Sequence, residues 1–372
     1  MNFKNLAIIE AIAVIALIGF SAYAVVTYPP AAQPIAINGA GATFPAPLYQ
    51  KMASEYKNIT GVNINYQGIG SGAGVNQFNA TVVDFAASDP PLSSSQYSYF
   101  TTHGYNPLQI PMAIGGIAFA YNIPGVTGHL NFTGTVLAAI FQGNITHWND
   151  ANITALNPGL SSVTQAIVIC HRSDSSGSTK ITSTFLHDNG AGQYGAWKIG
   201  VGNVVSWPSS SLGGSGNPGV AALTGSNQYS IGYVELQYAL GSTLTYGNLK
   251  NPAGFFITPS LSSLSATVKA VNAVLPANGS SSFASIGVYL NLHSNSSNAD
   301  ACYPITSFTY ILVCQNLHLI PDMTPQKALA LRAFLLWAVN QGQAYSAGLS
   351  YVPLPANVVA FDEVTIGSIF FA

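Results

Sequence analysis

The stretch IAINGAGATFP (Ile35–Pro45) sets the α/β character of this chain. The apolar run at Ile35–Asn38 predicts a short strand, and the glycines that follow predict a tight turn. Pro45 favours the first position of a helix, which we expect to run to about Lys57. A strand that leads through such a turn into a helix is the repeating unit of α/β folds, so an α/β fold is predicted.

The same unit recurs directly downstream. Val62–Gln67 is typical of a second strand, and the glycine-rich stretch Gly68–Gly74 leads into a helix expected near Val75–Asn79. A third strand, Val82–Ala87, ends directly before Ser88 and Asp89. Open α/β sheets bind ligands at the carboxyl ends of their parallel strands, so these loops are expected to converge on one ligand.

A third loop of this kind, His171–Thr179, holds one of only two arginines in the chain. Arg172 lies beside Asp174 and four serines, and a helix is expected from Lys180 onward. The serine and glycine run therefore falls where a helix leaves its first N–H groups unpaired, which attracts anions. A guanidinium held by a carboxylate suits an oxyanion. An ordinary helix cap with a surface Arg–Asp pair is the alternative.

The composition bounds the class of protein. A chain of 372 residues with 48% hydrophobic residues can bury a large core and favours two domains. Charged residues make up only 6%, against about 25% in an average soluble protein. With a net charge of −2 the chain lacks the excess of basic residues that nucleic-acid binding requires, so no nucleic-acid partner is expected. The low charge suits a surface outside the cytoplasm, and an acidic exterior is one hypothesis for it.

The N-terminal segment predicts export. Residues 1–28 carry Lys4 and then a largely apolar run from Leu6 that Glu10 interrupts, which fits either a signal peptide or an uncleaved membrane anchor with the body outside. Residues 29–35 form a Pro-rich linker. Seven glycosylation sequons make an exported glycoprotein plausible. They begin at Asn58, Asn79, Asn131, Asn144, Asn152, Asn278 and Asn295.

The cysteines and common motifs exclude several kinds of site. Cys302 and Cys314 flank a predicted strand that would hold them too far apart for a disulfide, so buried free thiols are expected for these and Cys170. No Cys or His lies at metal-ligand spacing, and neither a metal nor a cofactor is expected. A glycine pattern at Gly68–Ala73 matches the dinucleotide fingerprint, but its preceding strand is not apolar enough for a buried parallel strand.

A set of short sequence blocks is spread along most of the chain after residue 36. The blocks are Gly39–Tyr49, Asn65–Val75, Val83–Ser93, Ile114–Gly125, His147–Asp150, Leu156–Leu160, Arg172–Ser178, Trp207-Pro208, Gly213–Asn217, Ile231–Glu235 and Tyr303–Ser307. Together they resemble the phosphate-binding proteins of Pst-type ABC transporters. The resemblance implies a two-lobed, type II periplasmic-binding-protein-like α/β fold with a ligand cleft between the lobes. It places residues 36–111 plus 301–372 in lobe 1 and residues 112–300 in lobe 2.

The resemblance also implies a phosphate site. Its residues would be Thr43, Phe44, Ser71, Asp89, Arg172, Ser176, Gly177 and Ser178. Most of them would donate hydrogen bonds from backbone or hydroxyl groups, with Arg172 as the one full positive charge and Asp174 supporting it. Asp89 would accept a hydrogen bond from a protonated phosphate oxygen, which sulfate cannot offer. The family commonly has threonine where this chain has Ser178.

The predicted function is extracellular binding of inorganic phosphate and its delivery to an ABC transporter permease by a monomeric, non-enzymatic receptor. Two alternatives belong to other classes. A receptor for another tetrahedral anion, such as sulfate, would have to overcome the charge of Asp89. A secreted phosphatase on the same scaffold would need a metal cluster or an activated nucleophile, and the sequence shows no such constellation.

Overall fold

The computed structural model describes residues 35–271, 275–283, 286–290 and 292–372. The predicted signal peptide or anchor (1–28) and almost all of the predicted linker (29–35) lie outside the described residues. Among the residues that are described, none of the helices combines the length and apolar character needed to cross a membrane.

A long mixed sheet runs through both lobes of the molecule, in the order β2-β1-β3-β12-β4-β8-β6-β7, with β9 also paired to β4. At one end of the sheet β1 pairs in parallel with β2 and β3, and at the other end β6 pairs in parallel with β7 and β8. Between these ends the pairs β3–β12, β12–β4 and β4–β8 are antiparallel. The strands are β1 (Ala36–Gly41), β2 (Asn63–Gly68), β3 (Phe85–Ser88), β4 (Pro107–Asn122), β6 (Val168–Arg172), β7 (Leu212–Gly214), β8 (Ser230–Glu235), β9 (Thr245–Tyr246) and β12 (Thr306–Cys314).

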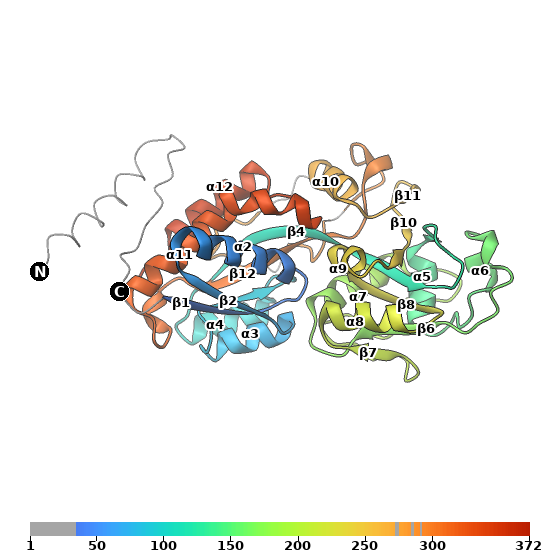
Figure 1. Ribbon diagram of the computed structural model, residues 1–372, viewed down its shortest axis with the longest axis horizontal. Coiled ribbons are helices and arrows are strands. Elements are labelled where there is room, and N and C mark those ends of the chain that lie inside the picture. The colour runs from blue at the N-terminus through green and yellow to red at the C-terminus, as the bar shows by residue number, and fades with distance from the viewer. Residues whose placement is uncertain (1–34, 272–274, 284–285, 291) are drawn as a thin grey trace, which may run out of the picture.

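Strand β4 joins the two lobes. Its first part pairs with β12 as far as Gly116, and from Ile117 onward it pairs with β8 instead. The strand is buried along almost its whole length and spans about 50 Å at 3.3 Å per residue. A continuous apolar run is what a strand covered on both faces requires. Figure 1 shows β4 passing from the lobe that holds β1 and α2 to the lobe that holds β6 and α7, which confirms the predicted two-lobed α/β fold.

Helices cover the sheet in each lobe (Figure 1). The first lobe holds α2 (Ala46–Thr60), α3 (Ser71–Asn79), α4 (Ser94–Thr102), α11 (Pro325–Val339) and α12 (Ala356–Gly367). The rest of the chain holds α5 (Gly134–Phe141), α6 (Ala151–Thr154), α7 (Gly177–Asn189), α8 (Gly216–Ser226), α9 (Leu236–Gly241) and α10 (Leu261–Ala270). A small separate sheet consists of β5 (Asn131–Phe132), β10 (Asn248–Lys250) and β11 (Phe256–Ile257).

The predicted elements are present, with shifted ends. The first helix, α2, begins after Pro45 and ends at Gly61, whose left-handed backbone (φ +76°) closes the last turn. The helix expected near Val75–Asn79 begins four residues earlier, at Ser71. The three cysteines are buried free thiols, as predicted.

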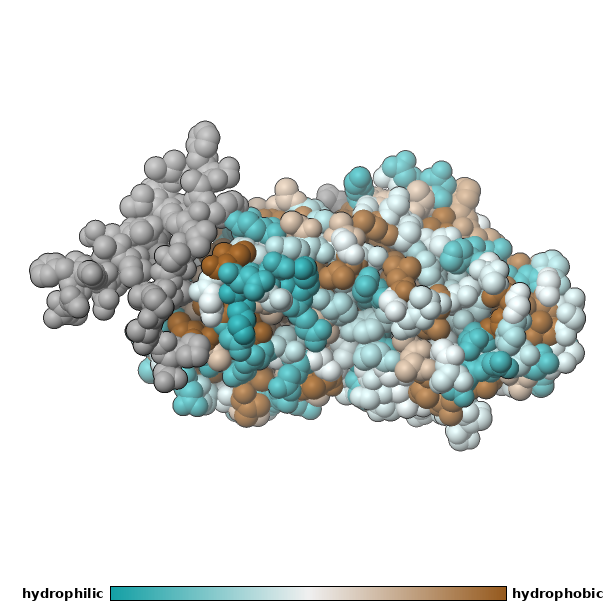
Figure 2. Space-filling model, in the orientation of Figure 1, coloured by the Kyte–Doolittle hydropathy of each residue, from teal (hydrophilic) through white to brown (hydrophobic). Residues whose placement is uncertain are grey.

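The surface reflects the low charge of the sequence. Much of the face seen in Figure 2 is pale, which corresponds to near-neutral hydropathy, and its apolar residues lie in small separate groups. Gly, Ser, Thr and Tyr therefore supply much of the solvent-facing surface that charged residues supply in an average protein.

Candidate anion-binding site between the lobes

Four helix N-termini converge where the lobes meet. Helices α2 and α3 come from the first lobe, and α7 and α8 come from the second. In α7 the cap is Ser176, whose hydroxyl accepts a hydrogen bond from the N–H of Thr179 at 3.1 Å. The earlier first-turn N–H groups, those of Gly177 and Ser178, are not consumed by this cap. Amide dipoles from both lobes therefore point into one region, which favours an anion.

Asp89 lies at the centre of the first-lobe side. It follows β3 and is almost fully buried, with 1% of its surface exposed. The hydroxyl of Thr309 on β12 donates to Oδ1 at 3.0 Å, and the hydroxyl of Ser71 donates to Oδ2 at 3.4 Å. Burial raises the pKa of Asp89 to about 7, although these hydrogen bonds and the nearby Arg172 act in the opposite direction. The carboxyl can therefore change its charge near neutral pH.

Gly177 allows the second lobe to approach Asp89 closely. A Cβ atom at this position would lie 2.4 Å from Asp89 Oδ2 and 2.4 Å from the Ser71 hydroxyl oxygen. Both distances are well inside van der Waals contact, so a larger residue cannot occupy this place without moving the lobes apart. The N-terminus of α7 therefore lies directly against the Asp89–Ser71 pair.

Arg172 ends β6 and is held by a two-pronged ion pair. Its Nε lies 2.7 Å from Asp174 Oδ1 and its Nη2 lies 2.5 Å from Oδ2. Burial works to raise the pKa of Asp174, but the hydrogen bonds and charge of Arg172 bring that pKa below its ordinary value. The N–H of Gly216 also donates to Asp174 Oδ1 at 3.0 Å, which ties the pair to the start of α8. The guanidinium is thus buried in a fixed orientation.

Asn217 on α8 connects hydroxyl groups from both lobes. Its N–H and its side-chain Nδ2 donate to Thr43 Oγ1 at 3.1 and 3.0 Å, and Nδ2 also donates to Ser178 Oγ at 3.2 Å. The Ser178 hydroxyl accepts a second bond from Arg172 Nη1 at 3.4 Å. A hydroxyl oxygen that accepts two hydrogen bonds keeps its own proton for another acceptor. Thr43 and Ser178 are therefore oriented as donors toward an anion.

Further hydrogen bonds hold the lobes in a closed arrangement. The N–H of Gly72 donates to the carbonyl of Ser175 at 3.0 Å, and the Tyr238 hydroxyl donates to the carbonyl of Thr43 at 2.6 Å. These bonds join the first-lobe turns to α9 and to the loop before α7. Closure brings every predicted donor and acceptor of the site into one buried cluster.

The structure brings the predicted site residues together. Those on the first-lobe side are Thr43, Phe44, Ser71 and Asp89, and those on the second-lobe side are Arg172, Asp174, Ser176, Gly177 and Ser178. The carbonyl of Phe44 accepts a hydrogen bond from the Tyr351 hydroxyl at 2.7 Å, and its ring is buried. Contact of these residues with phosphate stays a prediction.

Sequence reasoning missed four residues of this cluster. Asn217, Glu235 and Thr309 lie in or next to blocks that carried the family resemblance, but no role followed from the blocks themselves. No sequence pattern indicated a role for Tyr238. Glu235 is a further carboxyl at this junction, and it is fully buried. Burial raises its pKa well above the ordinary value.

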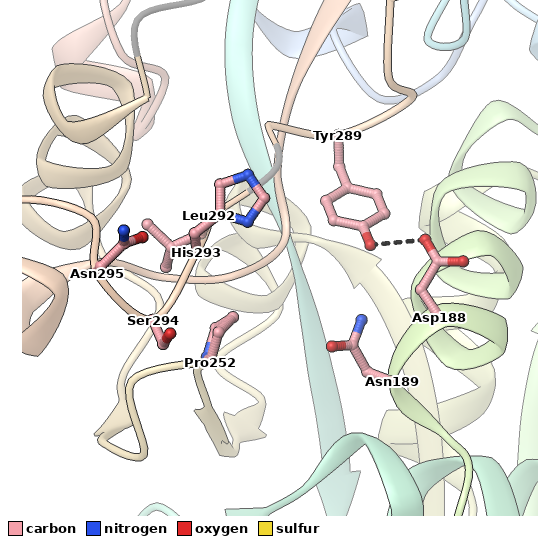
Figure 3. Close-up of a pocket in the computed structure, with 8 residues that line it drawn as sticks. All are labelled: Asp188, Asn189, Pro252, Tyr289, Leu292, His293, Ser294 and Asn295. Atoms are coloured by element: carbon pink, nitrogen blue, oxygen red, sulfur yellow. Dashed lines mark hydrogen bonds between the residues drawn. The ribbon is translucent and has the colours of Figure 1, made fainter.

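A surface depression of about 900 Å³ lies elsewhere on the molecule. Figure 3 shows its lining, where the Tyr289 hydroxyl donates to Asp188 Oδ2 at 2.9 Å near Asn189 and Pro252. It is open to solvent, and its charged side chain is a carboxylate, which repels anions. The closed interlobe cluster, not this depression, has the donors that an oxyanion requires.

The comparisons with known proteins agree with this geometry. Residues 28–341 match the family model described as a PBP superfamily domain. The phosphate-binding protein PstS of Pasteurella multocida is 38% identical over 343 residues, covering 91% of each chain. The one from Methanocaldococcus jannaschii is 35% identical over 333 residues, covering 87% of this chain and 84% of its own. A periplasmic phosphate-binding protein solved with bound phosphate (PfluDING) has the same fold, with a TM-score of 0.71 and 23% identity over 88% of this chain and 92% of its own.

Proposed function

The chain belongs to the family of PstS phosphate-binding proteins, and we propose that it binds inorganic phosphate between its lobes and delivers it to an ABC transporter. The observation that carries this proposal is the buried Asp89, which faces the N-terminus of α7 at Gly177 beside the Arg172–Asp174 pair. This combination of one buried acceptor with many donors matches an oxyanion that still carries a proton.

Each side of the cluster would contribute a different part of the binding. Thr43, Phe44 and Ser71 would donate from the first lobe, and Ser176, Gly177 and Ser178 from the second. Arg172 would supply the positive charge, in an orientation that Asp174 fixes. Directed hydrogen bonds would then hold the anion, each contributing about 0.5–3 kcal/mol net.

Asp89 would set the choice between phosphate and sulfate. Its ionised carboxylate can accept a hydrogen bond from a protonated phosphate oxygen, whereas sulfate would meet it with no proton between the two charges. Because burial raises the pKa of Asp89 to about 7, this discrimination should operate above neutral pH and weaken below it.

The proposal extends to the organisation and location of the protein. We take residues 36–111 and 301–372 as lobe 1 and residues 112–300 as lobe 2, with β4 and the segment before β12 as the crossings. The protein would be exported and monomeric, held at the cell surface by residues 1–28 or released after their cleavage. Among its sequons, Asn131 and Asn152 are half-buried, and the exposed ones would accept a glycan more readily; these are Asn58, Asn79, Asn144, Asn278 and Asn295.

We further propose that the protein is a receptor and not a phosphatase. In the described part of the chain, the His, Cys, Asp and Glu side chains form no group suited to hold a metal ion. Asp89, the buried carboxyl at the site, is bound by two hydroxyls and faces an amide N-terminus, which suits a fixed acceptor better than a nucleophile.

Calorimetric titration of the full chain with inorganic phosphate and with sulfate, across neutral pH, tests the proposal. We expect phosphate to bind with one site per chain and sulfate to bind more weakly above about pH 7. Ser95→Ala, an exposed change on α4, provides a matched control because it leaves the cluster intact. Failure of phosphate to bind the wild-type protein at any pH would overturn the proposed function.

A further inference from the structure

Glu235 is a buried carboxyl at the junction of the lobes that the phosphate contacts do not use. It is the last residue of β8 and pairs with Ile117, the first residue of β4 on the second-lobe side. Its side chain reaches back to the first lobe, where Oε2 lies 3.0 Å from the Tyr351 hydroxyl. The N–H of Gln237 donates to the same oxygen at 3.0 Å. Glu235 therefore links the two lobes beside the crossing strand.

The Tyr351 hydroxyl lies within hydrogen-bond distance of two acceptors, and a proton on the Glu235 carboxyl lets both contacts be hydrogen bonds at once. The Tyr351 hydroxyl oxygen lies 2.7 Å from the carbonyl oxygen of Phe44 and 3.0 Å from Glu235 Oε2. A hydroxyl has a single proton, and a carbonyl oxygen can only accept. When Tyr351 donates to Phe44, the contact with Glu235 is a hydrogen bond only if the carboxyl donates to Tyr351.

The other carboxyl oxygen supports the same protonation state. Among the described residues, Glu235 Oε1 has no hydrogen-bond partner, although it is fully buried. An ionised carboxylate with one unpaired buried oxygen is strongly disfavoured, whereas a neutral acid tolerates a free carbonyl oxygen better.

Among the described residues no side-chain cation pairs with this carboxyl, and its charged form is favoured only by N–H groups at the start of α9 and by Tyr351. The titratable groups near it are Tyr351 from the C-terminal segment, Tyr238 on α9 and Asp89 after β3, and Asp89 acts to raise the pKa of Glu235 further. The described ion pairs do not include Glu235. When the lobes separate, the carboxyl loses Tyr351 and gains water, which returns it to the ionised form at neutral pH.

We propose that Glu235 takes up one proton each time the lobes close around phosphate, and that in this neutral form it positions the Thr43–Phe44 turn through Tyr351. The proposal rests on the proposed function, because it concerns closure around that ligand. Glu235 is thus a positioning residue, and closure is coupled to proton uptake at a group that does not touch the anion.

The sign of the pH effect follows from this coupling. The closed state holds a proton that the open state releases, so closure is favoured at low pH and loses stability as the pH rises above the ordinary range of a glutamate. One proton taken up per closure corresponds to a loss of up to about tenfold in phosphate affinity per pH unit. This loss adds to the effects of Asp89 and of phosphate itself.

Comparison of the wild type with Glu235→Gln isolates the contribution of this residue. Calorimetric titration with inorganic phosphate, in buffers of different ionisation enthalpy between about pH 6 and 9, counts the protons taken up. The substitution leaves the Asp89 side chain and the phosphate themselves unchanged, so we expect the wild type to take up about one proton more and its affinity to fall more steeply with pH. Tyr351→Phe should lower the affinity by removing the link to Phe44.

A spectroscopic measurement keeps the test independent of how the variant folds. The chain has only four glutamates, Glu10, Glu55, Glu235 and Glu363. Infrared difference spectra of the wild type with 13C-labelled glutamate should show a protonated carboxyl band that appears on phosphate binding and shifts with the label. An equal proton count and pH slope in Glu235→Gln, or no such band, would overturn the inference. Lack of phosphate binding by the wild type would instead overturn the proposed function.

Discussion

Gly177 provides the sharpest test of how closely the lobes must approach. The substitution Gly177→Ala adds a Cβ atom 2.4 Å from both Asp89 Oδ2 and the Ser71 hydroxyl oxygen. Relief of these contacts requires the second lobe, which carries both α7 and α8, to withdraw by roughly 1 Å, since non-bonded heavy atoms prefer separations near 3.5 Å. A shift of that size breaks the bonds from Asn217 to Thr43, which are 3.0–3.1 Å long. We therefore expect the closed state to lose stability and phosphate affinity to fall.

The magnitude follows from the bonds that are lost. Two or three interlobe hydrogen bonds at about 1 kcal/mol each amount to about 3 kcal/mol, which corresponds to roughly a hundredfold loss of phosphate affinity. The unfolding temperature without ligand should stay the same or rise, because alanine favours a helix more than glycine does. Fold and binding should thus respond in opposite directions, which separates a closure defect from misfolding.

Titration calorimetry with phosphate and thermal unfolding together measure both effects. Gly241→Ala is the matched control, because it makes the same change at the end of α9, where an added Cβ meets nothing within 4 Å. The control should bind phosphate like the wild type. Wild-type phosphate affinity in Gly177→Ala would refute the reasoning, since it would mean that closure does not bring α7 against Asp89.

Three further predictions concern single side chains of the site. Asp89→Asn should strengthen sulfate binding and reduce the preference for phosphate over sulfate by at least about tenfold. Competition titration of the wild type should show this preference rising as the pH increases through about 7, where Asp89 ionises. Arg172→Ala should lower the affinities for phosphate and for sulfate alike, by about a thousandfold in each titration, because it removes the positive charge and leaves Asp174 without its partner. A change in selectivity without loss of affinity would contradict this role. Asn217→Ala should lower phosphate affinity by about tenfold, because the Thr43 hydroxyl is no longer oriented as a donor; Asn227→Ala, at the other end of α8, should leave it unchanged.

The strand, turn and helix pattern of the first lobe could be predicted because its signals are local. Ile35–Pro45 encodes a strand, a glycine turn and a helix start within a few residues, and the structure has all three. The start of α3 was misplaced because glycines disfavour helices in isolation. At Gly74 packing outweighs that preference, since a Cβ atom there would lie 2.4 Å from the Cα of Gly41 on β1. Tertiary contacts of this kind leave no local pattern.

The parts of the site that sequence reasoning missed are contacts between distant residues. Thr309 binds Asp89 across a separation of 220 residues, and Asn217 binds Thr43 across 174. Motif resemblance supplied Thr43 and Asp89 because their blocks carry known donors and acceptors. It supplied no role for the residues that hold them, since those roles exist only once the two lobes are closed.

The last feature is the distribution of the few charged residues between the lobe junction and the rest of the protein. Of its 22 charged residues, given by 10 basic and 12 acidic ones, four meet at the lobe junction: Asp89, Arg172, Asp174 and Glu235. Arg172 and Asp174 neutralise each other at hydrogen-bond distance, while burial raises the pKa of Asp89 and Glu235. The protein groups of the closed junction can therefore approach neutrality. In the proposed site, amide dipoles at the N-termini of α2, α3 and α7 would attract the anion in place of a cluster of cations, and with more selectivity than a high positive charge allows.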